Sequence, residues 1–123
     1  MIRKYKDSDY NELQSWQHAR GLNMPAQIYL SNMGFIVPNK AAGFLYTTNS
    51  GVCHLEMIMS NPDIDKQDRD IAINKIVELA IFTSQALGYK VITSTTTIDA
   101  IVERAKQHGF TVEQNHSLLI KKL

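Results

Sequence analysis

The stretch VCHLEMIMSNPDIDKQDRDIAINKIVELAIFTSQAL, residues 52 to 87, decides the fold. Its opening run from Val52 to Ser60 is apolar and is typical of a long strand. The turn-forming residues from Pro62 to Asp65 end that run. From about Arg69 to Leu87 apolar residues return at helical spacing, and Gly88 supplies a stop. The recurring positions are Ile73, Ile76, Val77, Ala80, Ile81 and Ser84. The stretch predicts a strand followed by a long amphipathic helix.

The residues before this stretch predict a short strand, a helix and a β-hairpin. Ile2 to Tyr5 alternates weakly, and Asp9 and Glu12 have the spacing of a capping box ahead of a helix that runs to about Arg20. Gly21 ends that helix. After an irregular connection around Pro25, residues 28 to 37 supply a strand that is broken near Gly34. Residues 41 to 47 and 52 to 60 flank the turn cluster at 49 to 51, so they predict a hairpin.

The residues after this stretch complete one domain that covers residues 1 to 123. Val91 to Thr95 is β-rich, Thr96 and Asp99 offer a second capping pair, and Gly109 ends the helix that follows. Residues 117 to 123 supply a last strand. The predicted fold is α/β (α+β), with a mixed, mostly antiparallel central sheet flanked by helices.

Composition excludes several classes of function. Thirteen Lys and Arg against twelve Asp and Glu give a net charge of +1, so nucleic acid and anionic membranes are not expected partners. No run of apolar residues is long enough to span a bilayer. Cys53 is the only cysteine, which favours the reducing cytoplasm and a packing role for this side chain. The four histidines show no ligand spacing, so no metal site is expected.

Three local features resemble the GNAT acetyltransferase superfamily, as does the order of the predicted elements. Residues 57 to 62 resemble that family's central strand and its exit, residues 67 to 72 resemble its cofactor loop, and Gly109 with Phe110 resembles the Gly-Phe that closes its last helix. The resemblance implies an acyl-CoA N-acyltransferase-like fold. It also implies transfer of an acetyl group from acetyl-CoA to an amine of a small molecule or protein. Strand amides at Met57, Ile58 and Met59 would hold the pantetheine arm.

The cofactor loop departs from the family pattern at one position. The family has Gln or Arg, two residues, Gly, one residue, then Gly or Ala, where this chain has Gln67, Asp68, Arg69, Asp70, Ile71 and Ala72. The pattern serves an anion site at a helix N-terminus, and Asp70 adds a carboxylate there. Two like charges about 4 Å apart cost on the order of 4 kcal/mol near a surface. Either Asp70 weakens cofactor binding, with Lys66 and Arg69 as offsetting cations, or it caps the helix and fills the anion site of an inactive interaction module.

Glu56 is the candidate catalytic residue that the resemblance implies. It precedes Gln67 by eleven positions, a spacing similar to that of the general base in histone-acetylating members. A carboxylate of raised pKa can take the proton of the attacking amine. Strict alternation would place Leu55, Met57 and Met59 in the core and Glu56 on the opposite face, with an exposed glutamate of no role as the alternative.

The resemblance also implies a general acid that this chain lacks at the family's positions. Many members carry an Asn and a Tyr there, and the matching residues are Ile98 and Ala105, which have no side-chain proton to give. Active members without that tyrosine exist. Ser94, Thr95 and His108 lie nearby in the sequence. Finally, an exposed strand at the end of the sheet could pair with a second copy, which makes a homodimer possible.

Overall fold

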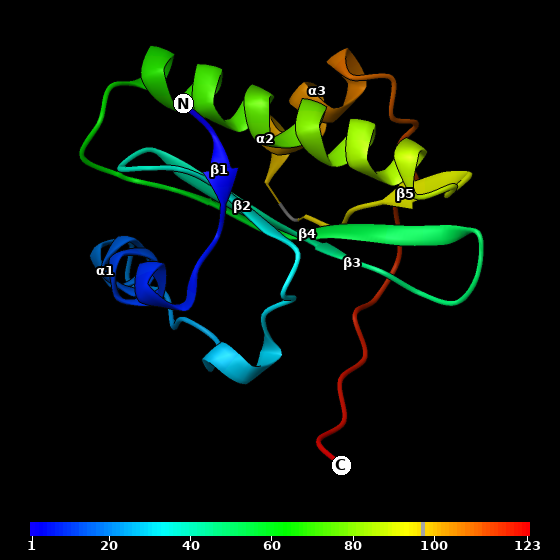
Figure 1. The fold of residues 1–123 in the computed structure, drawn as a ribbon, viewed down its shortest axis with the longest axis horizontal. Helices are drawn as coiled ribbons and strands as arrows, with labels where there is room; N and C mark the ends of the chain where they lie inside the picture. The colour runs from blue at the N-terminus through cyan, green and yellow to red at the C-terminus, as the bar shows by residue number, and fades with distance from the viewer. Residues whose placement is uncertain (97) are drawn as a thin grey trace.

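A computed structural model describes residues 1–96 and 98–123 and shows a five-stranded sheet between helices (Figure 1). The strands lie in the order β1-β2-β3-β4-β5. Neighbouring strands from β1 to β4 are antiparallel, and β4 and β5 are parallel. The elements are β1 (Arg3–Lys4), α1 (Tyr10–Ala19), β2 (Gly34–Val37), β3 (Ala41–Tyr46), β4 (Val52–Ser60), α2 (Lys66–Ala86), β5 (Val91–Thr93) and α3 (Asp99–Gln107). The predicted fold class is confirmed.

The sheet separates two hydrophobic cores, one under each layer of helices. In Figure 1, α2 and α3 lie on one side of the sheet and α1 lies on the other. The α2-side core consists of Phe35, Val37, Ala41, Leu45, Cys53, Leu55, Ala72, Ile76, Val77 and Ala80. The α1-side core consists of Leu13, Trp16, Ile36, Ala42, Phe44 and Met59. Because both faces of the sheet are covered, β2 and β3 read as continuous apolar runs in the sequence.

A β-bulge on β4 reverses the alternation of side chains along that strand. Phe44 pairs with Glu56 and Ala42 pairs with Met59, so two steps on β3 match three steps on β4. Met57 lies inside the bulge at φ 57°, in the left-handed region. The extra residue changes the face of every later side chain. Leu55 therefore enters the α2-side core, whereas Met59 enters the α1-side core.

The predicted alternation along β4 is therefore wrong beyond Glu56. Met57 was expected in the core with Leu55 and Met59, but its side chain is 40% exposed. Ile58 was expected to share the face of Glu56, but it packs against the α2-side core. The prediction for Glu56 itself holds, since this residue pairs with Phe44 and lies on the α1 face of the sheet.

The start of α2 and the capping of α1 differ from the predictions. The helix α2 begins at Lys66, about three residues earlier than the apolar pattern indicates, because Asp65 caps it by accepting from the Asp68 amide. The predicted capping box of Asp9 and Glu12 is absent, since Asp9 makes no side-chain cap at α1. Asp9 is buried and instead accepts two hydrogen bonds from Arg3 and one from the Lys6 amide.

The predicted last strand is also missing from the structure. Residues 117 to 123 form no strand, and residues 111 to 123 are exposed. Before them, α3 ends as predicted at Gly109, which has a φ of 87°, and Phe110 packs against the α2-side core. Across the described residues, no helix is long and apolar enough to cross a membrane.

Gly43 of β3 gives a test of how closely α2 is packed against the sheet. A Cβ at this position would lie 2.6 Å from Cγ2 of Ile76. We therefore expect Gly43→Ala to reduce the free energy of unfolding by about 1 to 3 kcal/mol, measured by urea denaturation. Gly51→Ala is the matched control, because its Cβ would meet nothing closer than 3.9 Å. Equal stability of the two variants would contradict this account of the packing.

Candidate functional site

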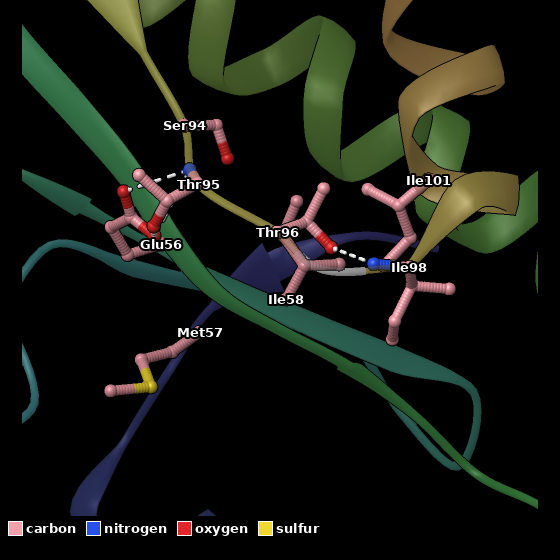
Figure 2. A pocket seen from close by; sticks show the side chains of 8 residues that line it. All are labelled: Glu56, Met57, Ile58, Ser94, Thr95, Thr96, Ile98 and Ile101. Carbon is pink, nitrogen blue, oxygen red and sulfur yellow. Dashed lines mark hydrogen bonds between the residues drawn. The ribbon is translucent and has the colours of Figure 1, made fainter. Parts of the chain in front are cut away.

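The parallel strands β4 and β5 separate beside the bulge, and a cleft opens between them. Their pairing runs from Val52 with Val91 to His54 with Thr93. Beyond this point the strands diverge around a cleft of about 300 Å³. It is lined by Glu56, Met57, Ile58, Ser94, Thr95, Thr96, Ile98 and Ile101 (Figure 2). The cleft therefore combines one carboxylate and several hydroxyls with apolar side chains from β4 and α3.

Glu56 bridges the gap between the diverging chains. Its Oε1 accepts a hydrogen bond from the Thr95 amide at 3.1 Å, and its Oε2 accepts one from the Thr95 hydroxyl at 3.0 Å (Figure 2). Two residues earlier on each chain, at the last pair of the β4–β5 ladder, the His54 ring contacts the Thr93 hydroxyl. Beyond that last pair, the Glu56 carboxylate links the two chains at the head of the cleft. Glu56 is the predicted catalytic residue that the structure does place in the cleft.

The environment of Glu56 has opposing effects on its pKa. Burial disfavours the charged carboxylate and raises the pKa, while the hydrogen bonds from Thr95 and the nearby His54 act in the other direction. Burial is the larger effect, so the pKa of Glu56 is raised above its ordinary value. A raised pKa brings a carboxylate closer to the range in which it accepts and releases protons near neutral pH.

The bulge residues contribute backbone groups as well as shape. Ile58 points toward Thr96 and α3, whereas the Met57 side chain lies on the other side of β4 (Figure 2). A bulge leaves its extra residue unpaired in the ladder, so the backbone at Met57 is available to another partner. A non-glycine residue in the left-handed region is also strained, and such strain is concentrated at functional sites.

The predicted cofactor loop forms the first two turns of α2. The Asp65 carboxylate accepts a hydrogen bond from the Asp68 amide. The amides of Lys66 and Gln67, in the first turn of the helix, can therefore donate hydrogen bonds to another acceptor. The side chain of Arg69 reaches back 3.5 Å to the Ile64 carbonyl. Ile71 is exposed, and Ala72 is buried in the α2-side core. The cleft-lining residues in the described part of the chain do not include residues 67 to 72.

Asp70 does not cap α2, which corrects one of the two readings of that residue. Its carboxylate accepts from Lys66 at 2.8 Å and forms an ion pair with Arg104 of α3. The hydrogen bond from Lys66, helped by the charges of both cations, lowers the pKa of Asp70. Asp70 is therefore ionised but paired with two cations. Sequence reasoning missed Arg104, because only the fold brings α3 against the second turn of α2.

The residues near the missing general acid fall into two groups. Ser94 and Thr95 line the cleft, and so does Ile98. His108 follows the last residue of α3 as its C-cap, and its ring Nε2 lies 3.2 Å from Oδ1 of Asn74 in α2. Of the three candidates named from the sequence, only the two hydroxyls line the cleft.

Solved structures share this architecture over nearly the whole chain. A transcriptional regulator from Bacillus halodurans matches with a TM-score of 0.75 at 12% identity, covering 98% of this chain and 99% of its own. A Mycobacterium tuberculosis protein solved in complex with CoA matches with a TM-score of 0.72 at 14% identity, covering 97% and 76%. A GNAT-family acetyltransferase from Streptococcus pneumoniae matches with a TM-score of 0.68 at 11% identity, covering 100% and 98%.

These matches show that the chain has the fold of the GNAT acetyltransferases. No protein-family model matches the sequence, and no curated protein sequence is detectably similar to it. The likeness therefore lies in the arrangement of the elements and extends to few residues. The roles of Glu56 and of residues 57 to 59 and 67 to 72 stay predictions.

The Thr95 hydroxyl gives a direct test of the carboxylate geometry. Thr95→Val removes the hydroxyl that donates to Glu56, and this bond holds the pKa down. We therefore expect the pKa of Glu56 to rise further, measured by NMR titration of its carboxyl carbon. Thr93→Val is the control, because its hydroxyl contacts His54 and should leave the pKa of Glu56 nearly unchanged. An unchanged or lower pKa in Thr95→Val would contradict the described contact.

Proposed function

We propose that this protein is an N-acetyltransferase that moves an acetyl group from acetyl-CoA to an amine of an unidentified acceptor. The observation that carries the proposal is the bulge at Met57, which opens β4 away from β5 and leaves Glu56 at the head of a cleft. The GNAT fold supports the same activity, as does a CoA complex among the matching structures. The lone, buried Cys53 is in keeping with action in the reducing cytoplasm.

The residues that would hold acetyl-CoA come from two places in the fold. Backbone groups of the segment from Met57 to Met59, in which Met59 pairs with Ala42 of β3, would bind the pantetheine arm beside the bulge. The free amides of Lys66 and Gln67, with the positive end of the α2 dipole, would bind its phosphates. The helix α3 contacts both of these sites. Its Ile101 lines the cleft beside the bulge, and its Arg104 forms an ion pair with Asp70 in the second turn of α2.

The transfer itself needs one group to accept a proton. A neutral amine attacks the thioester carbonyl, a C–N bond forms, and the C–S bond breaks to release the CoA thiolate. Glu56 would take the proton of the amine, directly or through a water molecule, and its raised pKa suits that role. The thiolate would leave without help from a tyrosine or take its proton through a hydroxyl such as that of Ser94, which lines the cleft.

The alternative is a GNAT-fold interaction module that has lost activity. That reading rests on Asp70 filling the phosphate site from within. The structure gives this alternative less support than the sequence does. Asp65, not Asp70, caps α2, and the Asp70 carboxylate forms ion pairs with Lys66 and Arg104. Isothermal titration with acetyl-CoA separates the two functions. Binding favours the transferase, whereas no binding by the wild type or by Asp70→Asn favours the interaction module.

Neutralising Asp70 should strengthen binding of the cofactor. Asp70→Asn removes a negative charge beside the helix start and frees Lys66 and Arg104 to attract phosphate. We expect acetyl-CoA to bind about tenfold more tightly, which corresponds to about 1.4 kcal/mol, measured by titration calorimetry. Glu103→Gln serves as the control, because it removes one negative charge from an exposed ion pair on α3, that of Glu103 with Lys106. Unchanged affinity in Asp70→Asn would remove residues 67 to 72 from the cofactor site.

Glu56→Gln should abolish most of the transfer while leaving cofactor binding intact. Glutamine keeps the shape of the side chain but cannot accept the amine proton. We expect kcat for thiol release across a panel of amines to fall by about 100-fold or more, with acetyl-CoA affinity within about twofold of the wild type. The exposed Glu78 of α2 provides the control Glu78→Gln. Full activity in Glu56→Gln would exclude Glu56 as the base.

A further inference from the structure

The connection between α1 and β2 is an uncharged segment on the α1 side of the sheet. Between Arg20 and Lys40 the sequence has no acidic, basic or histidine side chain. Part of this connection is a short 3-10 helix at Gln27–Tyr29, which we call the 27–29 turn. Figure 1 shows the turn on the same side of the sheet as α1, and Leu30 directly after it packs against the α1-side core. The turn therefore lies on the side of the sheet that carries Glu56.

Tyr46 fastens the 27–29 turn to the sheet close to Glu56. Its hydroxyl donates a hydrogen bond to the Tyr29 carbonyl at 2.8 Å. Tyr46 ends β3, and Phe44, two residues earlier on the same face, pairs with Glu56. Tyr46 and Glu56 are therefore diagonal neighbours across two strands. Burial raises the pKa of Tyr46, and the charge of the Glu56 carboxylate acts in the same direction.

Apolar side chains of the turn and of the bulge are open to solvent. Ile28 and Tyr29 are 85% and 62% exposed, and Met57 is 40% exposed. In Figure 2 the Met57 side chain lies on the other side of β4 from Ile58. Sites for small molecules are lined mainly by apolar and aromatic side chains, with a few polar groups that fix orientation. These exposed side chains and Glu56 have that composition.

Glu56 brings the only charge to the cleft. Among the described residues that line it, every other side chain is apolar or carries a hydroxyl. One carboxylate can pair with one ammonium group. A second cationic group on the acceptor would face the uncharged 27–29 turn without an anionic partner, and moving such a group out of water costs free energy. The charges therefore favour an acceptor with a single amine and an apolar body.

We propose that the acceptor is a small monoamine with an apolar body, and that Tyr46 is a positioning residue that holds the 27–29 turn against that body. This inference rests on the proposed transfer reaction and names its substrate class. The amine binds at Glu56, and the apolar body contacts Ile28 and Met57. The Tyr46 hydroxyl is bonded to the Tyr29 carbonyl, so it acts on the acceptor through the turn.

Tyr46→Phe tests the role of the hydroxyl, because it keeps the ring and removes only the bond to Tyr29. With 2-phenylethylamine as the acceptor, we expect KM for the amine to rise about tenfold, while kcat and the affinity for acetyl-CoA stay within about twofold. Tyr10→Phe is the matched control. The Tyr10 hydroxyl donates to the Pro25 carbonyl of the same connection at 2.7 Å, but Tyr10 belongs to α1. A purely structural role of such bonds would change KM equally in both variants.

A pair of amines tests the substrate class. We expect the wild type to have a kcat/KM for 2-phenylethylamine at least about tenfold above that for 1,4-diaminobutane, which carries a second cation. Ile28→Asp places a carboxylate on the 27–29 turn and should reduce that ratio by about tenfold or more. Phe82→Asp is the control, since Phe82 is an exposed apolar residue of α2 on the opposite side of the sheet, and the ratio should stay unchanged. Ile28→Asp also keeps the test open if Tyr46→Phe does not fold.

The outcomes separate this inference from the proposed function. Thiol release by the wild type with an unchanged KM in Tyr46→Phe would exclude Tyr46 as a positioning residue and leave the transferase standing. Equal kcat/KM for the two amines, or an unchanged ratio in Ile28→Asp, would overturn the substrate class. No thiol release by the wild type with any amine would overturn both the inference and the proposed function.

Discussion

The inserted residue at Met57 is the constraint on which the rest of the structure depends. Without it, β4 would present one row of side chains to each helix layer along its whole length. With it, Leu55 belongs to the core under α2 and Met59 to the core over α1. The same distortion ends the pairing with β5 and creates the cleft. Packing on both faces and the opening of the site thus share one cause.

Local patterns predicted most of the fold, because each element carries its own signal. The hairpin, the long helix and the stop at Gly109 follow from apolar spacing and turn residues. The bulge could not be predicted, because Met57 and Ile58 look like ordinary strand residues and only the pairing with β3 shows the extra step. The start of α2 was placed late for a similar reason. Its first turn is polar and gives no apolar period, although Asp65 caps it.

The candidate site was predicted in its composition but not in its electrostatics. The family resemblance singled out Glu56 through its spacing from Gln67 on the predicted central strand, and the structure puts this residue at the cleft. Its bonds to Thr95 depend on two segments that are 39 residues apart in the chain. The charge at Asp70 was likewise visible in the sequence, whereas its partner Arg104 comes from α3. Long-range pairs of this kind leave no periodic trace in a single sequence.

The attachment of α3 has a consequence for the motions of the protein. No residue of this helix is fully buried, and it is fastened to α2 by the pairs Arg104 with Asp70 and His108 with Asn74. Elements that bury little apolar surface open locally at a small free-energy cost, without unfolding of the rest of the domain. We therefore expect the α3 wall of the cleft to open at a smaller free-energy cost than the sheet and its two cores.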